Sequence, residues 1–170
     1  MIILSIGSNL SSTFGDRFQN IMYAIAYLEK YEIKVIKKSS YYESPSQPNI
    51  NDPKFINIVI EVLTSLDPEN LASVLLFIEE KLERKRGEKN SPRTCDIDII
   101  DFNSEVKSFK YNNLEFFVPH EKISERNFIL YPLQEIIPKW KHPKTGVYID
   151  KLIEKISDED KKSILKIDKP

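Results

Sequence analysis

"FINIVIEVL", residues 55–63, decides the fold class, because its side chains alternate in character with a period of two. That period is typical of a β-strand, whose successive side chains point to opposite faces of a sheet. One face is entirely branched and apolar, which predicts that a layer of helices covers it. The opposite face starts with Phe55 and Asn57 and is therefore less uniform. The apolar face holds Ile56, Ile58, Ile60 and Val62.

An amphipathic helix is expected on each side of this strand along the chain. The first spans about residues 16–30, and the second begins after Asp67, with Pro68 at its first helical position. The basic run "ERKRGEK", residues 83–89, is expected to end the second helix, with Gly87 as its terminator. The two apolar stripes are Phe18, Ile21, Met22, Ile25 and Leu28, and Leu71, Val74, Leu75, Ile78 and Leu82.

Further strands are expected at residues 2–6, at 33–42 and around "CDIDII", residues 95–100. Through residue 102 the predicted order is strand, helix, strand, strand, helix, strand, which is the ferredoxin-like βαββαβ order. The sequence therefore predicts an α+β fold in which both helices lie on one face of a mainly antiparallel sheet. The other face is left for a ligand or for the C-terminal segments.

The C-terminal part of the chain carries weaker signals. We expect a strand or turn near 107–111, an extended stretch "LEFFVPH" at 114–120, a short helix near 129–136 and a last helix at 150–157. Since no repeat or linker divides the chain, we expect a single domain over residues 1–160. A polar tail at 161–170 follows it and is expected to fray.

The composition excludes several classes of protein. The 170 residues include 25 basic and 26 acidic side chains, so no overall positive field points to nucleic acid. No apolar run is long enough to span a membrane, and "MIILSIGSNL" at the N-terminus is typical of a first strand and not of a signal peptide. The single Cys95 allows no intrachain disulfide, which favours a reducing compartment. We therefore expect a cytoplasmic protein, as a monomer.

Two aspartates share one face of the strand that contains "CDIDII". A spacing of two places the carboxylates of Asp96 and Asp98 on the same side, about 7 Å apart at the backbone. Two such charges repel, so one pKa should rise unless a cation lies between them. Mg²⁺ suits this place because it prefers oxygen ligands and is commonly held by one or two carboxylates and substrate phosphates. Taken alone, a D-x-D pair is a weak signal, and a solvated edge strand with two surface aspartates is the favoured interpretation.

Cationic side chains flank the aspartate pair along the chain. Arg93 precedes Asp96 by three residues, and Arg84 and Arg86 lie in the basic run before it. The later stretch "VPHEKISERNF", residues 118–128, adds a histidine and an arginine, His120 and Arg126. Cations beside paired carboxylates indicate a site for metal and phosphate, because arginine forks neutralise phosphate oxygens. The basic run by itself fits a solvated helix end.

Other common sites find no support in the sequence. The four glycines form neither a P-loop nor a G-x-G-x-x-G motif, so side-chain cations must hold any phosphate. "GSNL" lacks the pattern of a nucleophile elbow. Zinc is not favoured, because the chain has one cysteine and two separated histidines, His120 and His142.

Several blocks together resemble the 6-hydroxymethyl-7,8-dihydropterin pyrophosphokinase family of folate biosynthesis, over about residues 2–150. The most specific is the combination of "PRTCDIDII" (92–100) with the downstream "VPHEKISERNFILYPL" (118–133). The other blocks are "IGSNL" (6–10), "YYESP" (41–45), "FINIVIEVLTSL" (55–66), "IEEKLERKR" (78–86) and "EIIP" (135–138).

The resemblance implies an enzyme that transfers pyrophosphate from ATP to the hydroxymethyl group of a reduced pterin and releases AMP. It implies that Asp96 and Asp98 hold two Mg²⁺ ions and that Phe55 and Phe128 sandwich the pterin, whose polar edge Asn57 contacts. The remaining pterin-binding positions would be Gly7, Ser44, Pro45 and Gln47. The nucleotide-binding positions would be Glu79, Arg84, Arg93, Ile99, His120 and Arg126, with Arg84 and Arg93 also acting on the transferring group.

The chain departs from the family pattern at several positions. Asn90 and Ser91 stand where tryptophan and glycine are familiar, Glu115 stands where a basic residue would be expected, and Glu121 replaces an aromatic residue. Two alternatives remain open, namely another Mg²⁺-dependent transferase with a D-x-D motif and a non-catalytic ferredoxin-like binding module. Loss of Asp96 or Asp98 would abolish activity in a pterin pyrophosphokinase and in another D-x-D transferase, but would change little in a binding module.

Overall fold

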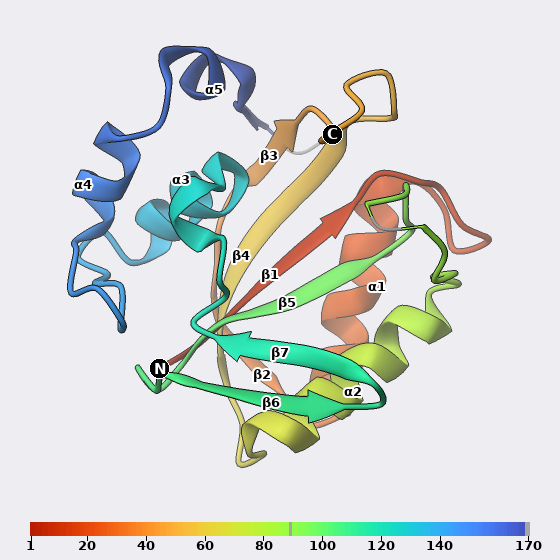
Figure 1. Ribbon diagram of the computed structural model, residues 1–170. Coiled ribbons are helices and arrows are strands. Elements are labelled where there is room, and N and C mark those ends of the chain that lie inside the picture. The colour runs from red at the N-terminus through yellow and green to blue at the C-terminus, as the bar shows by residue number, and fades with distance from the viewer. Residues whose placement is uncertain (89, 169–170) are drawn as a thin grey trace.

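The computed structural model describes residues 1–88 and 90–168, which form an α+β fold around a mainly antiparallel sheet (Figure 1). Strand β4 (Phe55–Leu63) lies in the interior of this sheet, with β1 (Ile2–Ser8) on one side and β2 (Lys34–Lys38) and β3 (Tyr41–Ser44) on the other. Strand β5 (Asp96–Phe102) pairs with the far side of β1. The paired strands run antiparallel, which confirms the predicted fold class, with β2 and β3 together in the place of one strand of the predicted βαββαβ order.

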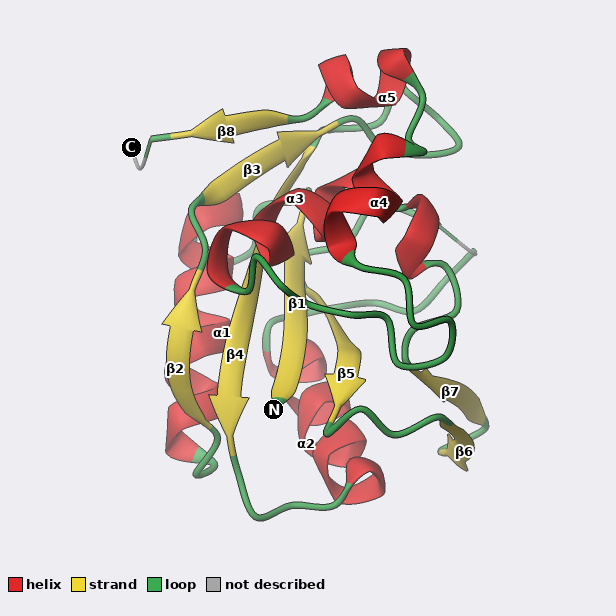
Figure 2. Cartoon of the chain, turned by 90° about the vertical axis from the view of Figure 1, so that its left-hand side faces the viewer, coloured by secondary structure: helices red, strands yellow, loops and turns green. Residues whose placement is uncertain are grey.

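Helices α1 (Arg17–Lys30) and α2 (Pro68–Lys81) cover one face of the sheet (Figure 2). The isoleucines of β4 are fully buried against this layer, together with Ile97 and Ile99 of β5. The prediction that one face of β4 packs against helices is therefore confirmed. Asp67 caps α2 as expected, because its side chain accepts a hydrogen bond from the backbone N–H of Asn70.

The opposite face of the sheet is shared between a second core and a hollow. Helix α3 (Asn127–Ile136) packs on β4 and β3, and α4 (Ile149–Glu154) packs on α3. Val59 of β4 and Trp140 belong to this second core. The short helix predicted near 129–136 is thus confirmed as α3. Beyond it, the ends of β1, β4 and β5 that carry Gly7, Asn57 and Asp96 border a cavity.

A two-stranded sheet lies beside β5. It consists of β6 (Lys107–Tyr111) and β7 (Leu114–Val118), whose Phe109 and Phe116 rings stack 5.2 Å apart. The extended stretch predicted at 114–120 is therefore a strand over residues 114–118. The single-turn helix η1 (Ile123–Glu125) connects this hairpin to α3.

The expected strand at 33–42 is wrong as one element, because the chain forms β2 and β3 with a break at residues 39–40. At the break the backbone N–H of Ser39 donates to Val59 O, and Ser39 Oγ accepts from Val59 N. The side chain of Ser39 thus replaces a regular ladder bond, and each half pairs separately with β4.

The expected end of the second helix in the basic run is also wrong. Helix α2 ends at Lys81, and Glu83 adopts a left-handed conformation with φ of 65°. Backbone N–H groups of Glu83 and Arg84 then donate to the oxygens of Glu80 and Glu79, which closes the helix before Gly87. Arg84 and Arg86 therefore lie in the loop that leads to β5.

The C-terminal part is more ordered than expected. Helix α4 ends at Glu154, and a further helix α5 (Asp158–Ser163) follows. Strand β8 (Leu165–Ile167) pairs antiparallel with β3, so the expectation that the tail frays is wrong for its described part. Among the described residues, no helix is long and apolar enough to cross a membrane.

Candidate active site

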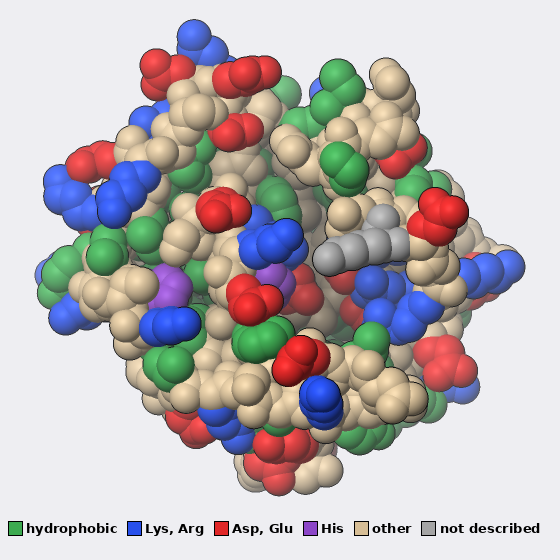
Figure 3. Space-filling model, viewed as in Figure 1, with side chains coloured by type: hydrophobic (Ala, Val, Ile, Leu, Met, Phe, Trp, Pro, Cys, Tyr) green, Lys and Arg blue, Asp and Glu red, His purple; other side chains and the backbone are tan. Residues whose placement is uncertain are grey.

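The site is organised by three neighbouring strand ends. The register of the sheet places Gly7 of β1 opposite both Asn57 of β4 and Asp96 of β5. Ser5 of β1 likewise lies opposite Asp98. Because the side-chain period of a strand is two, both aspartates and Asn57 face the side of the sheet that α1 and α2 do not cover. This face is hollowed near its centre, with basic side chains on either side of acidic ones (Figure 3).

Asp96 is held by two arginines that come from the loop before β5. Arg84 Nη1 lies 2.6 Å from Oδ1 of Asp96, and Arg93 Nη2 lies 2.6 Å from Oδ2. Burial alone would raise the pKa of Asp96, but the charges of Arg93 and Arg84 outweigh it and lower the pKa to about 2. Asp96 is therefore a carboxylate that is already neutralised by protein cations.

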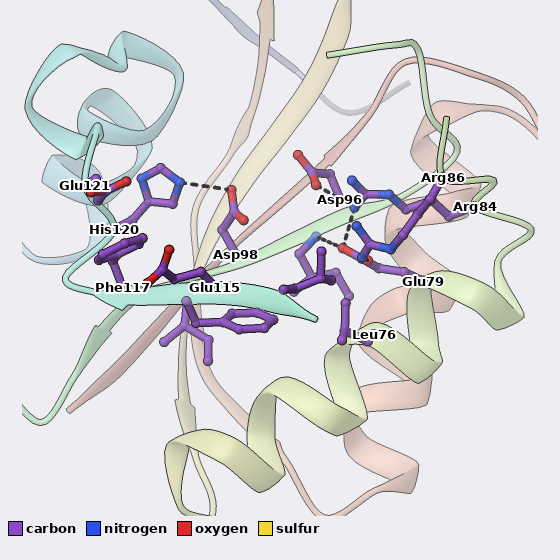
Figure 4. A pocket seen from close by; sticks show the side chains of 14 residues that line it. Leu76, Glu79, Arg84, Arg86, Asp96, Asp98, Glu115, Phe117, His120 and Glu121 are labelled. Carbon is purple, nitrogen blue, oxygen red and sulfur yellow. Dashed lines mark hydrogen bonds and ion pairs between the residues drawn. The ribbon is translucent and has the colours of Figure 1, made fainter. Parts of the chain in front are cut away.

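Asp98 lies in a different electrostatic environment. Its Oδ2 is 3.3 Å from Arg126 Nη1. The same oxygen is 3.9 Å from His120 Nε2 (Figure 4). Burial and the charge of Asp96 raise the pKa of Asp98 above its ordinary value. His120 Nδ1 accepts from the backbone N–H of Lys122, which leaves Nε2–H directed toward Asp98. The pair thus has one carboxylate with two arginines at 2.6 Å and one with a single arginine at 3.3 Å.

Glu79 ties helix α2 to the start of β5. It is only 3% exposed, and its Oε1 accepts from Arg84 Nη1 at 2.6 Å and from Ile97 N at 2.8 Å. Its Oε2 accepts from Arg86 Nη2 at 2.7 Å (Figure 4). Burial raises the pKa of Glu79 to about 7, against the charge of Arg84. Glu79 therefore fixes the position from which Arg84 reaches Asp96.

Two cavities meet at the aspartate pair. The first has a volume of about 260 Å³ and extends between α2, β5 and β7. Asp96 and Asp98 line both cavities. Four of the six residues expected to bind nucleotide line the first cavity, which also contains both acidic departures from the family pattern. It is lined by Glu79, Arg84, Ile99, His120, Glu115 and Glu121, among others.

The second cavity has a volume of about 360 Å³ and contains all seven positions expected to bind a pterin. Asn57 Nδ2 donates to Ser44 Oγ at 2.9 Å, which orients the amide at the floor of the cavity. The seven positions are Gly7, Ser44, Pro45, Gln47, Phe55, Asn57 and Phe128. Arg93 and Arg126, expected to bind nucleotide, also line this cavity rather than the first.

An arginine side chain lies over each of the two aromatic rings, Phe55 and Phe128. The guanidinium of Arg93 lies 4.9 Å from the ring centre of Phe55, and that of Arg126 lies 5.6 Å from the ring centre of Phe128. Both distances fall in the range of cation–π contacts. Arg93 and Arg126 thus each bridge one ring and one aspartate.

The aspartate pair fits a divalent cation by its chemistry. Carboxylate oxygens are the preferred ligands of Mg²⁺, and two of them with added phosphate oxygens make a common magnesium site. Among residues 1–88 and 90–168, no group of three or more His, Cys, Asp or Glu side chains forms a metal site. The phosphates of a nucleotide would therefore have to complete the ligand set.

Sequence reasoning missed several residues that build the site. Asn9, in the block "IGSNL", donates to Ser46 Oγ and Pro53 O and accepts from Arg93 N, so it joins three loops. The asparagine after a strand end was a usable signal for this role. The far C-terminal residues Asp160 and Ser163 also line the second cavity, and no local pattern marked them. Lys122, Glu125 and Asn127 line it as well.

Comparison with known proteins supplies a family and several relatives. A family model described as 7,8-dihydro-6-hydroxymethylpterin-pyrophosphokinase matches residues 3–138. The Aquifex aeolicus protein named 2-amino-4-hydroxy-6-hydroxymethyldihydropteridine pyrophosphokinase is 37% identical over 142 residues, which cover 84% of this chain and 83% of that protein. The Bacillus subtilis protein of the same name is 34% identical, with 86% and 84% covered.

Longer relatives match over only part of their length. The folic acid synthesis protein of Pneumocystis carinii is 37% identical over 96% of this chain, but the chain spans about a fifth of it, 21%. Among solved structures, a Plasmodium falciparum HPPK-DHPS double mutant with pterin and p-hydroxybenzoate gives a TM-score of 0.76 at 17% identity. The match covers 98% of this chain and 47% of the Plasmodium falciparum chain. At this identity the structural likeness shows the fold alone.

Proposed function

The chain belongs to the 7,8-dihydro-6-hydroxymethylpterin-pyrophosphokinase family, and from this premise we propose that it performs the pyrophosphokinase step of folate synthesis. It would transfer the pyrophosphate group of ATP to the hydroxymethyl group of 6-hydroxymethyl-7,8-dihydropterin and release AMP. The observation that carries this proposal is the meeting of two cavities at Asp96 and Asp98. One cavity suits a flat ring between two aromatic side chains, and the other is bordered by cations that suit phosphates.

The reaction is a displacement at phosphorus. The hydroxymethyl oxygen forms a bond to the β-phosphorus, the bond from that phosphorus to the α–β bridging oxygen breaks, and AMP leaves with the electron pair. The hydroxyl proton passes to solvent or to a nearby carboxylate such as Asp98. Transfers of this kind depend on positioning and electrostatic stabilisation more than on covalent help from the protein. The aspartate pair lies between the two cavities, where both substrates would meet.

Arg84 and Arg93 are the proposed groups that act on the transferring phosphates. Each already donates to a carboxylate oxygen of Asp96, which shows that both guanidinium groups reach this point. A polyphosphate carries more charge than one carboxylate and accepts the same forked donation. Glu79 would keep Arg84 in reach, since it holds the same nitrogen at 2.6 Å.

Mg²⁺ is the proposed cofactor, as two ions held by Asp96 and Asp98. Bound there, the ions would supply positive charge to the phosphate oxygens and polarise them. His120, Arg126 and Ile99 are proposed nucleotide contacts around the same carboxylates. Asp98 is the more available of the two carboxylates for a cation, because it has one arginine at 3.3 Å, whereas Asp96 has two at 2.6 Å.

The pterin is proposed to lie between Phe55 and Phe128. Asn57 would contact the polar edge of the ring, because its amide lies in the same cavity and is oriented by Ser44. Gly7 would lie against the same edge, since a Cβ atom there would be 3.0 Å from Asn57 Oδ1. Pro45 and Gln47 would complete the wall from the loop after β3.

The test is AMP release from ATP by the purified protein with Mg²⁺, with and without 6-hydroxymethyl-7,8-dihydropterin. We expect AMP only when the pterin is present, and none from an Asp98→Ala variant. An Asp150→Ala variant serves as the matched control, because Asp150 is exposed on α4 and lines neither cavity. Production of ADP in place of AMP would contradict pyrophosphate transfer, and full activity of Asp98→Ala would contradict the proposed site.

A further inference from the structure

The C-terminal segment, residues 157–167, reaches the cavity proposed for the pterin although it lies beyond the family match at 3–138. Asp160 and Ser163 of helix α5 line the same cavity as Phe55, Asn57 and Phe128. Figure 1 shows α5 above α3, at the end of β3 from which the loop with Ser44 and Gln47 continues. The segment therefore borders a substrate cavity from a part of the chain to which the family match assigns nothing.

One end of the segment is fastened beside Phe128. Asn127 is 8% exposed, and its Nδ2 donates to Asp160 O at 2.6 Å and to Ser163 Oγ at 3.1 Å. Ser163 Oγ in turn donates to Asp160 O at 2.8 Å. Asn127 thereby joins α5 to the first turn of α3, directly next to one of the two aromatic residues of the cavity.

The other end is fastened to the opposite wall of the cavity. Strand β8 pairs with β3, with Tyr42 opposite Lys166. Lys166 Nζ also lies 3.5 Å from Glu135 Oε2 of α3, and the same carboxylate oxygen accepts from Tyr42 Oη at 2.7 Å. Strand β3 ends at Ser44, which lines the cavity and holds the Asn57 amide. The segment therefore links the wall that carries Phe128 to the wall that carries Ser44.

We propose that the C-terminal segment is a specificity element of the pterin site, in which Ser163 and Asp160 form the outer wall that limits the size of the bound ring. This proposal rests on the proposed function. The wall is polar, with a hydroxyl and a carboxylate, which suits a flat heterocycle whose edge carries N–H groups and does not suit an apolar ring. Since both ends of the segment are hydrogen-bonded, the wall is fixed and a bulkier side chain within it must displace the ligand.

The experiment compares Ser163→Phe with Lys162→Phe on the same helix. Ser163 lines the cavity, whereas Lys162 is exposed and does not line it. Isothermal titration measures the Kd of 6-hydroxymethylpterin in the presence of an ATP analogue with a methylene between the α- and β-phosphorus, and the Kd of the analogue alone. We expect Ser163→Phe to raise the pterin Kd by about tenfold or more and to change the analogue Kd by less than about twofold. We expect Lys162→Phe to change neither value.

An effect on the pterin Kd without an effect on the analogue Kd distinguishes a cavity wall from a merely structural segment. A general loosening of the fold would weaken the binding of both ligands. A Ser163→Phe protein that melts as the wild type does and binds the pterin equally well overturns the proposal. If that variant does not fold, Ser163→Ala decides, since loss of the hydroxyl should raise the pterin Kd by about threefold and an unchanged Kd overturns the proposal. Wild-type protein that binds no pterin would instead overturn the proposed function itself.

Discussion

Gly7→Ala tests the proposed pterin cavity at its tightest point. A Cβ atom on Gly7 would lie 3.0 Å from Asn57 Oδ1, 3.5 Å from Phe55 Cδ1 and 3.9 Å from Ile56 O. A contact of 3.0 Å to a Cβ atom is tighter than most Cβ contacts in proteins, so the Asn57 amide must move by a few tenths of an ångström. It cannot move freely, because Asn57 is 5% exposed and its Nδ2 donates to Ser44 Oγ.

Two effects of different size follow from this displacement. The crowding should lower the free energy of unfolding by about 1–2 kcal/mol, as is usual for overpacking, and should lower Tm by about 2–8 °C in a chain of this size. The shifted Oδ1 would also lose alignment with a donor on the pterin. A misaligned hydrogen bond costs about 1 kcal/mol, which corresponds to a roughly fivefold increase in the pterin Kd.

The assay measures Tm by calorimetry and the pterin Kd by titration in the presence of the ATP analogue. Gly87→Ala is the matched control, because a Cβ atom on Gly87 meets nothing within 4 Å. We expect the control to keep both values and Gly7→Ala to change both, with the Kd of the nucleotide analogue unchanged. A Gly7→Ala protein with a lowered Tm and wild-type pterin affinity would refute the contact between Asn57 and the pterin.

Three further predictions concern charge and buried polar groups. Arg93→Met removes a guanidinium that lies 2.6 Å from Asp96. We expect Mn²⁺ to bind roughly fivefold more tightly in the absence of nucleotide, as measured by electron paramagnetic resonance. An unchanged Kd for Mn²⁺ would contradict the conclusion that the arginines neutralise Asp96. Trp140→Phe removes the Nε1–H that donates to the buried Asp101 carboxylate at 2.8 Å. We expect the free energy of unfolding in urea to fall by about 1–3 kcal/mol. A decrease below about 0.5 kcal/mol would show that this hydrogen bond contributes little to stability. Burial lowers the pKa of His142 below its ordinary 6.5, so the unfolded chain binds the proton more tightly and the stability of the folded chain falls as pH drops below about 6.5. His142→Gln should reduce that pH dependence. If Tm plotted against pH has the same slope for the variant and the wild type, His142 is not its cause.

The elements that position the site could be predicted because their signals are local. The alternation in β4 and in "CDIDII" fixes which side chains share a face, and the structure places Asn57, Asp96 and Asp98 on the same side of the sheet. The register that places Gly7 between Asn57 and Asp96 is a finding of the structure, because antiparallel pairing alone does not fix it. Period therefore predicts which side chains share a face, and the observed register brings them together.

The errors arise where distant parts of the chain override a local rule. Gly87 was the natural terminator for α2, since glycine tolerates a left-handed backbone better than other residues. The chain instead turns at Glu83, whose carboxylate accepts from the backbone N–H of Thr13 at 3.0 Å and from its hydroxyl. Those bonds, from a loop 70 positions away, offset the cost of the left-handed conformation. The sequence around the end of α2 does not indicate these hydrogen bonds, because their donor, Thr13, lies elsewhere in the chain.

The order of the C-terminal segment has the same kind of cause. Its strand β8 is only three residues long, and a strand of that length has no stability of its own. It forms because β3 offers an unpaired edge and because Lys166 finds Glu135 on α3. A polar composition therefore predicted fraying, whereas the folded sheet supplies the partner that composition cannot reveal.

The arginines show how one arrangement can prepare the site for two ligands. Arg93 contacts Asp96 and the ring of Phe55, and Arg126 contacts the ring of Phe128 and approaches Asp98. Under the proposed function, the metal would take the place beside the aspartates and the pterin the place beside the rings. Both ligands therefore displace the same two guanidinium groups, and the phosphates of the nucleotide are the anions that can receive them. Because the arginines are shared between the two positions, the affinities for nucleotide, metal and pterin depend on one another in this geometry.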